Sequence, residues 1–277
     1  MQIITSIAQL RERLSDEPDV VFVPTMGNLH DGHLSLMHEA QEYGSCVVAS
    51  IFVNPLQFGP NEDFDRYPRT LEDDCRKLHG LASVVFAPSV DEMYPVEQSV
   101  FVEPPPVANE LCGAARPGHF RGMATVVLRL LNIVQPKVAL FGKKDYQQLY
   151  IVRTLVEQLN LPVLIIGGET VRDPDGLALS SRNQYLNPNE RAEAPFLYRT
   201  LQRLRQALQQ GERDFGRIER QAAELLSGRG WAVDYVSVRT QSDLAPADAS
   251  SRDLVIVAAA RLGKTRLLDN VEVSFDV

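Results

Sequence analysis

The sequence predicts an α/β fold in which a doubly wound parallel sheet is followed by a smaller α+β unit. Short, almost wholly apolar runs alternate with longer helical patterns through the first two-thirds of the chain. Strands that are apolar along their whole length are covered on both faces, as in a parallel sheet with helices on either side. After about Arg172 the pattern changes to helices followed by strands, which favours an α+β unit.

Each element follows from its own stretch of sequence. Apolar runs of strand length are predicted at 20–23, 46–53, 84–87, 138–141 and 163–166. Helical patterns separate them at about 32–43, 71–79, 122–133 and 146–159. This alternation is typical of a doubly wound sheet.

The last third of the chain predicts two charged helices and then strands. The helices are expected at 191–210, after a helix start at 187–190, and at 215–226. The strands are expected at 231–239, at 254–260 and near 271–275. We place the boundary in the turn-rich segment 172–188 and divide the chain into domains 1–175 and 176–277.

Composition excludes several classes of function. The 277 residues carry a net charge of −8 and the pI is about 5.2, which argues against nucleic acid or an anionic membrane as the main partner. No apolar run approaches the roughly 18 or more residues needed to span a bilayer. The N-terminus lacks the basic region and apolar stretch of a secretory signal. Three scattered cysteines suggest neither disulfides nor a zinc site. We expect a cytoplasmic enzyme.

Two of the five histidines, His30 and His33, stand at the junction of the first strong strand and the next helix. Ligands of open parallel sheets gather at the carboxyl ends of strands, where helix N-termini also point. Imidazole N–H groups there can donate to phosphate oxygens, and Gly27 and Gly32 let the backbone come close. One such histidine alone would be interpreted as a capping residue, whereas two favour a functional site. Metal ligation is the weaker interpretation because no third ligand has an evident spacing.

The segment 24–33, Pro-Thr-Met-Gly-Asn-Leu-His-Asp-Gly-His, resembles the signature of the pantothenate synthetase (pantoate–β-alanine ligase) family. Its His-x-Gly-His core also marks a wider nucleotidyltransferase superfamily. Further blocks resemble the family in the same order, at 52–58, 67–70, 116–122, 141–149 and 172–183. The resemblance covers most of the first 183 residues and implies a Rossmann-like nucleotidyltransferase fold.

The resemblance implies that ATP drives the condensation of pantoate with β-alanine through a pantoyl adenylate, releasing AMP and diphosphate. This reaction belongs to the biosynthesis of pantothenate and coenzyme A. Domain 1–175 would bind ATP and pantoate, and domain 176–277 would form a lid. Magnesium would accompany ATP, and the family's acidic position falls at Asp73 and Asp74. A homodimer is implied, without nucleic-acid or membrane partners.

Attack on the α-phosphate builds negative charge that cations and N–H donors must meet, and His30, His33, Lys144 and Arg182 are the candidate catalytic residues. The resemblance assigns Gln57 and Gln148 to pantoate, with Gln57 also near β-alanine; side-chain amides suit a hydroxy acid. It assigns nucleotide contacts to Met26, Gly27, Asn28, Leu29, His30, Asp31, Gly32, His33, Gly142, Lys143, Lys144, Asp145, Val171, Leu179, Ser180, Ser181 and Arg182.

Of the two lysines, we expect Lys144 to face the nucleotide and Lys143 to project into solvent. The segment 142–145 could also be only a turn with an aspartate cap, and Gln57 only a solvated loop amide. Asp73 and Asp74 could be an ordinary acidic helix turn. In 116–122 we expect Gly118 and Gly122 to form turns.

Three other functions compete with the ligase. An adenylyl- or cytidylyltransferase with the same His-x-Gly-His core would leave a nucleotide on its product. A catalytically silent nucleotide-binding protein would need degraded site residues, yet the histidines, Lys144 and Arg182 are present. A fragment of a tRNA synthetase ranks lowest because the chain has no basic anticodon-binding region.

Overall fold

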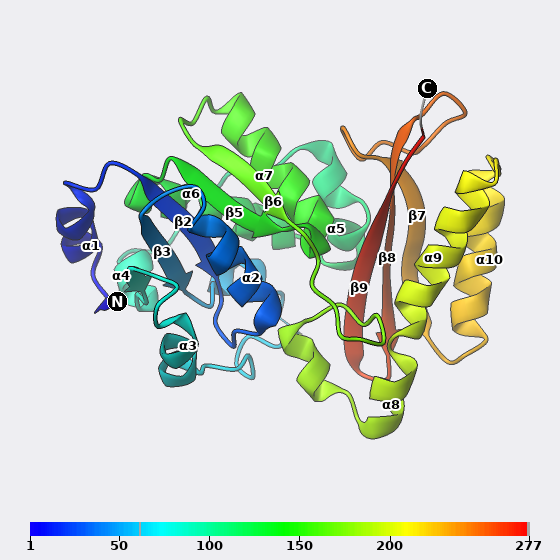
Figure 1. The fold of residues 1–277 in the computed structure, drawn as a ribbon, viewed down its shortest axis with the longest axis horizontal. Coiled ribbons are helices and arrows are strands. Elements are labelled where there is room, and N and C mark those ends of the chain that lie inside the picture. The colour runs from blue at the N-terminus through cyan, green and yellow to red at the C-terminus, as the bar shows by residue number, and fades with distance from the viewer. Residues whose placement is uncertain (61, 276–277) are drawn as a thin grey trace.

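The structure, a computed structural model, describes residues 1–60 and 62–275. Its first part is a six-stranded sheet in the order β1-β4-β3-β2-β5-β6, and all of its pairings are parallel (Figure 1). The strands are β1 (Gln2–Ile4), β2 (Val20–Thr25), β3 (Cys46–Ile51), β4 (Val84–Phe86), β5 (Val138–Gly142) and β6 (Leu164–Gly168). Chain order runs outward from the neighbours β2 and β5, through β3 and β4 on one side and β6 on the other, and β1 pairs beyond β4. The crevice of such a sheet therefore lies at the carboxyl ends of these two strands.

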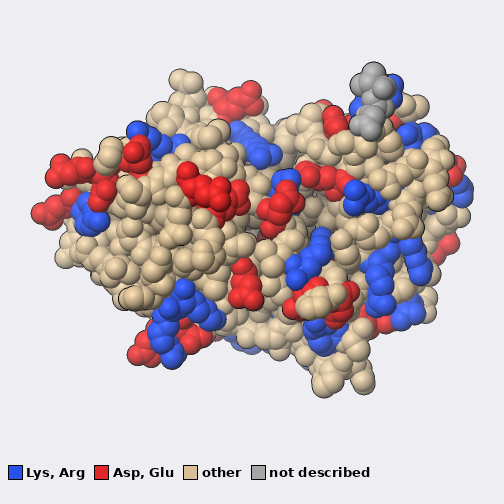
Figure 2. All heavy atoms as spheres, in the orientation of Figure 1, with Lys and Arg blue, Asp and Glu red and all other residues tan. Residues whose placement is uncertain are grey.

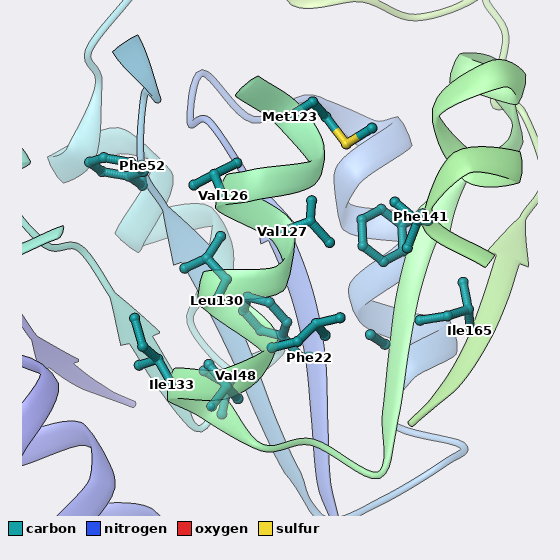
Figure 3. Close-up of a cluster of buried hydrophobic side chains, with 14 of the residues drawn as sticks. Phe22, Val48, Phe52, Met123, Val126, Val127, Leu130, Ile133, Phe141 and Ile165 are labelled. Atoms are coloured by element: carbon teal, nitrogen blue, oxygen red, sulfur yellow. The ribbon is translucent and has the colours of Figure 1, made fainter. Parts of the chain in front are cut away.

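Helices cover both faces of this sheet. One hydrophobic cluster joins alternate strand residues to α2 (Asp31–Ala40) and α3 (Leu71–Leu78). A second cluster, on the other face, joins the remaining strand residues to α1 (Ile7–Leu14), α4 (Val90–Met93), α6 (His119–Val134) and α7 (Tyr146–Gln158). Figure 3 shows that Val127 and Leu130 of α6 pack against the sheet beside Phe22. The prediction of a doubly wound sheet is confirmed.

The second part is a smaller antiparallel sheet in the order β7-β8-β9 with helices beside it (Figure 1). Its strands are β7 (Ala232–Thr240), β8 (Asp253–Leu262) and β9 (Thr265–Ser274). Its helices are α8 (Pro188–Glu193), α9 (Phe196–Gln209) and α10 (Phe215–Ser227), and they share a hydrophobic core with the sheet. The predicted α+β arrangement is confirmed. The proposed division between 175 and 176 falls in the segment that joins β6 to the 3-10 turn η4 (Ser181–Tyr185).

The structure departs from the expected elements in a few places. The helix expected over 191–210 is two helices, because Pro195 has no backbone N–H with which to continue α8. The last strand begins at Thr265 and pairs with β8 along its whole length. The strand β6 lies at the sheet edge, where Leu164 keeps 56% of its surface exposed. Neither β1 nor α1 is expected from the sequence, because only Ile4 of β1 and only Leu10 and Leu14 of α1 are buried and neither segment shows a clear apolar pattern.

Acidic and basic side chains are interspersed over the face drawn in Figure 2. Among the described residues, no helix combines the length and the apolar character needed to cross a membrane. Cys46, Cys75 and Cys112 are buried free thiols.

Candidate active site

Two adjoining cavities lie at the carboxyl ends of β2 and β5. The first, of about 230 Å³, is lined by the histidine segment, by Gln57 and Gln148 and by the loop after β5. The second, of about 420 Å³, extends from that loop toward β9 and α9. The cavities share the lining residues Arg116, Lys144, Asp145, Ser180 and Arg182. The crevice that the strand order requires is therefore where the predicted site residues collect.

A turn with two left-handed residues carries the chain from β2 into α2. Gly27 and Asn28 both have left-handed backbones, with φ of 81° and 51°. The carboxylate of buried Asp74 accepts the N–H groups of Asn28 at 2.9 Å and Leu29 at 2.8 Å, and also the hydroxyl of Thr70 at 3.0 Å. A Cβ at position 27 would lie 3.0 Å from this carboxylate. Asp74 therefore shapes the turn that leads to the histidines.

His30 and His33 together form the cap at the N-terminus of α2. His30 is the N-cap residue, and its Nδ1 accepts the N–H of Gly32 at 3.2 Å. His33 Nδ1 accepts the N–H of His30 at 3.3 Å, and the ring centroids are 4.1 Å apart. Because a backbone N–H can only donate, both Nδ1 atoms are unprotonated in the neutral rings. Each ring therefore carries its proton on Nε2, and both rings line the first cavity.

Both histidines are neutral at physiological pH. Burial lowers the pKa of His30 to about 4, with a further contribution from the positive charge of Lys144. Burial lowers the pKa of His33 to about 3, and His30 and Lys144 add to the effect. The pair therefore presents two neutral N–H donors beside an ammonium group.

The two lysines of the loop after β5 have different surroundings. Lys144 lines both cavities, and its Nζ lies 3.6 Å from the carboxylate of Asp145. Although burial raises the pKa of Asp145, Lys144 and Arg182 outweigh it and hold that pKa below its ordinary value. Lys143 points elsewhere: its Nζ contacts Glu169 at 2.5 Å and Glu272 at 3.1 Å. The expectation that Lys143 projects into solvent is wrong, because these two carboxylates hold it.

Gln57 lies in the 3-10 turn η1 (Pro55–Gln57) after β3 and is buried. Asn54 Nδ2 donates to Gln57 Oε1 at 3.0 Å, and Gln57 Nε2 reaches the thioether sulfur of Met26 at 3.4 Å. A thioether is a weak acceptor, so this N–H is readily given to a ligand oxygen. Gln148 lines the same cavity. Asn54, which the sequence analysis missed, orients the Gln57 amide and also lines the cavity.

The segment 116–122 packs against the backbone of the turn that carries Gln57. Gly122 lies inside α6, where a Cβ would approach the carbonyl oxygen of Leu56 to 2.0 Å, so the expectation of a turn at Gly122 is wrong. His119 Nδ1 donates to the carbonyl of Gln57 at 2.8 Å, and its Nε2 accepts from Arg116 at 3.0 Å. Burial, followed by Arg116, lowers the pKa of His119 to about 4. His119 is a second residue that the sequence analysis missed.

Two consecutive acids pair with the two arginines that line both cavities. Arg182 forms a pair of hydrogen bonds with Asp63 at 3.0 and 3.2 Å. Arg116 binds Glu62 in the same bidentate way at 2.5 and 2.6 Å. Arg182 thus lies at the predicted site, but its guanidinium is paired.

Asp73 and Asp74 do not fit a metal site in this geometry. Asp73 lies on the exposed side of α3, where it contacts Arg76 at 2.6 Å and Lys77 at 3.4 Å. The carboxylate of Asp74 is occupied by backbone and hydroxyl donors. Within the described residues, no group of three or more His, Cys, Asp or Glu side chains could hold a metal ion.

The predicted residues therefore divide into two groups. The structure brings together at the first cavity Met26, His30, Gly32, His33, Gln57, Gly142, Lys144, Asp145, Gln148, Val171, Leu179, Ser180, Ser181 and Arg182. The cavities are not lined by Gly27, Asn28, Leu29, Asp31, Lys143, Asp73 or Asp74. Gly27 to Leu29 and Asp74 act instead on the shape of the turn.

Comparison with known proteins places the chain in one family. The family model described as pantoate-beta-alanine ligase matches residues 2–272. The chain is 58% identical over 275 residues to the pantothenate synthetase of Methylobacillus flagellatus and 60% identical over 271 residues to that of Nitrosomonas europaea. These alignments cover 99% and 98% of both chains, respectively.

Solved structures agree with this. A pantothenate synthetase from Thermus thermophilus superposes with a TM-score of 0.93 at 45% identity, covering 99% of this chain and 100% of that one. A pantoate-beta-alanine ligase from Francisella tularensis, complexed with beta-gamma ATP and beta-alanine, superposes with a TM-score of 0.80 at 34% identity, covering 98% and 97%. With its sequence matched along almost its full length and its fold shared, this chain belongs to the pantoate–β-alanine ligase family.

Proposed function

We propose that this protein condenses pantoate with β-alanine in an ATP-dependent reaction that passes through a pantoyl adenylate and releases AMP and diphosphate. The observation that carries the proposal is the convergence of His30, His33 and Lys144 on the cavity that also exposes Gln57. The family to which the chain belongs supports it, as does the ligase from Francisella tularensis that was crystallised with beta-gamma ATP and beta-alanine.

In the first step a pantoate carboxylate oxygen attacks the α-phosphorus of ATP, and the bond to the β-phosphate breaks. Negative charge grows on the α-phosphate oxygens as diphosphate departs. The Nε2–H groups of His30 and His33 and the ammonium of Lys144 are fixed donors for that charge. Because their orientation is set before the substrates bind, little reorganisation is needed when the charge develops.

In the second step the uncharged amine of β-alanine attacks the acyl carbon, the acyl–oxygen bond breaks and AMP departs with that oxygen. The amine loses a proton as the amide forms. The Nε2–H of Gln57 and the amide of Gln148 are the groups proposed to hold the pantoate oxygens. Asn54 and His119 keep Gln57 in place through its side chain and its carbonyl.

We propose that magnesium accompanies the ATP phosphates, and we derive no step from a protein-bound ion because Asp73 and Asp74 do not fit one. Ser180, Ser181 and Arg182 line the cavity beside Lys144. Asp63 binds Nε and Nη2 of Arg182, so Nη1 of that guanidinium is proposed to take the remaining phosphate oxygens together with the two serines. Domain closure by 176–277, a homodimer and a cytoplasmic location stay predictions.

Exchange of labelled diphosphate into ATP tests the proposal. We expect exchange that requires pantoate and proceeds without β-alanine, together with AMP and pantothenate when β-alanine is added. Exchange without any hydroxy acid, or none with a panel of such acids, would contradict the adenylate. A product that keeps its nucleotide would instead identify a nucleotidyltransferase.

A further inference from the structure

Strand β9 reaches across to the loop that carries Lys144. The side-chain amide of Asn270 donates from Nδ2 to the carbonyl oxygen of Lys143 at 2.9 Å and to that of Lys144 at 2.8 Å. Carbonyl oxygens only accept, so the amide nitrogen must face them and both of its hydrogens are used. Asn270 is 7% exposed, and water therefore competes little for these bonds.

Asn270 is itself held in place. The buried carboxylate of Asp269 binds Arg172 with two hydrogen bonds, at 2.6 and 2.8 Å, and accepts the N–H of Asn270 at 2.8 Å. Arg172 also donates to the carbonyl of Asn270 at 3.3 Å, and its guanidinium lies 3.8 Å from the ring centroid of Tyr198. Arg172, in the segment after β6, therefore holds β9 in place, and β9 in turn holds the loop that carries Lys144.

The same strand also binds the other lysine of the loop, Lys143. Positions 270 and 272 lie on one face of β9 because side chains alternate along a strand. Glu272 takes the ammonium of Lys143 at 3.1 Å, while Asn270 holds the backbone of both lysines. The ammonium of Lys144 is left to line the cavities.

We infer that Asn270 is a positioning residue for adenylation: its amide sets the backbone of Lys144 so that this ammonium meets the α-phosphate in the transition state. The inference rests on the proposed function and deepens it. Asn270 touches no substrate in this account and acts only through Lys144. Misplacing a catalytic group by about 1 Å lowers a rate by about 100-fold, so loss of both hydrogen bonds should be visible in the rate.

The test is a double-mutant cycle on single-turnover formation of the adenylate. Asn270→Ala should lower the rate by about 30-fold with little change in the KM for ATP, since the transition state depends on this geometry more than binding does. In a Lys144→Ala background the same change should have almost no further effect. Tyr146→Phe is the matched control: it removes one hydrogen bond to β9, that of Tyr146 to Glu272 at 2.8 Å, and none to the carbonyls of the two lysines.

Equal losses with and without Lys144 would show that Asn270 has only a structural role and would overturn the inference. A rate unchanged by Asn270→Ala would overturn it as well. If that variant does not fold, Asn270→Asp, which keeps the size of the side chain but has no N–H to donate, takes its place in the cycle, and the same two results would overturn the inference. Absence of adenylate in the unmodified protein would instead refute the proposed function, so the two failures are distinguishable.

Discussion

Replacement of each lysine in the loop after β5 separates a catalytic charge from a structural one. Lys144 lines both cavities, shares the first with His30 and His33, and contributes through its charge to the lowered pKa of both histidines. Lys143 is held by Glu169 and Glu272. We therefore expect Lys144→Ala to impair adenylation and Lys143→Ala to affect mainly the local ion pairs.

The magnitudes follow from these surroundings. Loss of one fixed donor to a developing oxyanion costs about 3 kcal/mol, so Lys144→Ala should slow adenylate formation at least about 100-fold. The carboxylates that hold Lys143 are 81% exposed at Glu169 and 34% exposed at Glu272, and an ion pair open to solvent contributes at most about 1 kcal/mol. Lys143→Ala should therefore slow the step only a few-fold and lower the free energy of unfolding by about 1 to 2 kcal/mol.

Single-turnover formation of the adenylate, with enzyme in excess over ATP, measures the step directly. Binding of ATP measured in parallel separates a loss of affinity from a loss of rate. A larger loss of rate for Lys143→Ala than for Lys144→Ala would refute the assignment. Equal large losses would show that both ammonium groups reach the phosphates.

Three further predictions concern the histidines and Asp74. His33→Ala should lower the adenylation rate by about 100- to 1,000-fold in a protein that still folds, and a rate within a few-fold of the unmodified protein would count against its role as a donor. Asp74→Asn replaces one of the two oxygens that together accept three hydrogen bonds by an N–H donor; it should lower the free energy of unfolding by about 2 to 3 kcal/mol in denaturant titrations, while Asp73→Asn should change neither stability nor the magnesium dependence of the rate. Because the pKa values of His30, His33 and His119 lie at about 4, 3 and 4 in the folded protein against 6.5 unfolded, the unfolded chain binds more protons below pH 6.5. Their contribution to stability should be complete above pH 6.5 and decline as the pH falls toward 4, by up to about 1.4 kcal/mol per pH unit for each histidine; a free energy of unfolding unchanged between pH 7 and 5 would contradict neutral, buried rings.

The part of the site that lies within one strand–helix junction could be predicted from the sequence. An apolar strand such as β2 indicates a buried parallel sheet, and ligands of such sheets gather at its carboxyl edge. His30 and His33 follow that strand directly, so chain order alone brings them to the crevice. Lys144 follows β5 in the same way.

The contacts that join distant segments could not be predicted. The sequence shows Asp74 only as one acid of a helical turn, and its inward orientation depends on how α3 packs beside α2. One of the two carboxylates that hold Lys143, that of Glu272, stands 129 residues away on β9. Asn54 stands in the segment 52–58 without a predicted role, and Asn270 lies outside every segment that resembles the family, because a buried amide is recognised only by the groups that surround it.

Transfer of an oxygen isotope tests the acyl adenylate most directly. Pantoate labelled with ¹⁸O in both carboxylate oxygens is incubated with the protein, ATP and β-alanine. The masses of AMP and pantothenate are then measured by mass spectrometry. If the carboxylate attacks the α-phosphorus and the amine later breaks the acyl–oxygen bond, AMP carries one labelled oxygen and pantothenate keeps the other. Unlabelled AMP formed together with pantothenate would contradict the account.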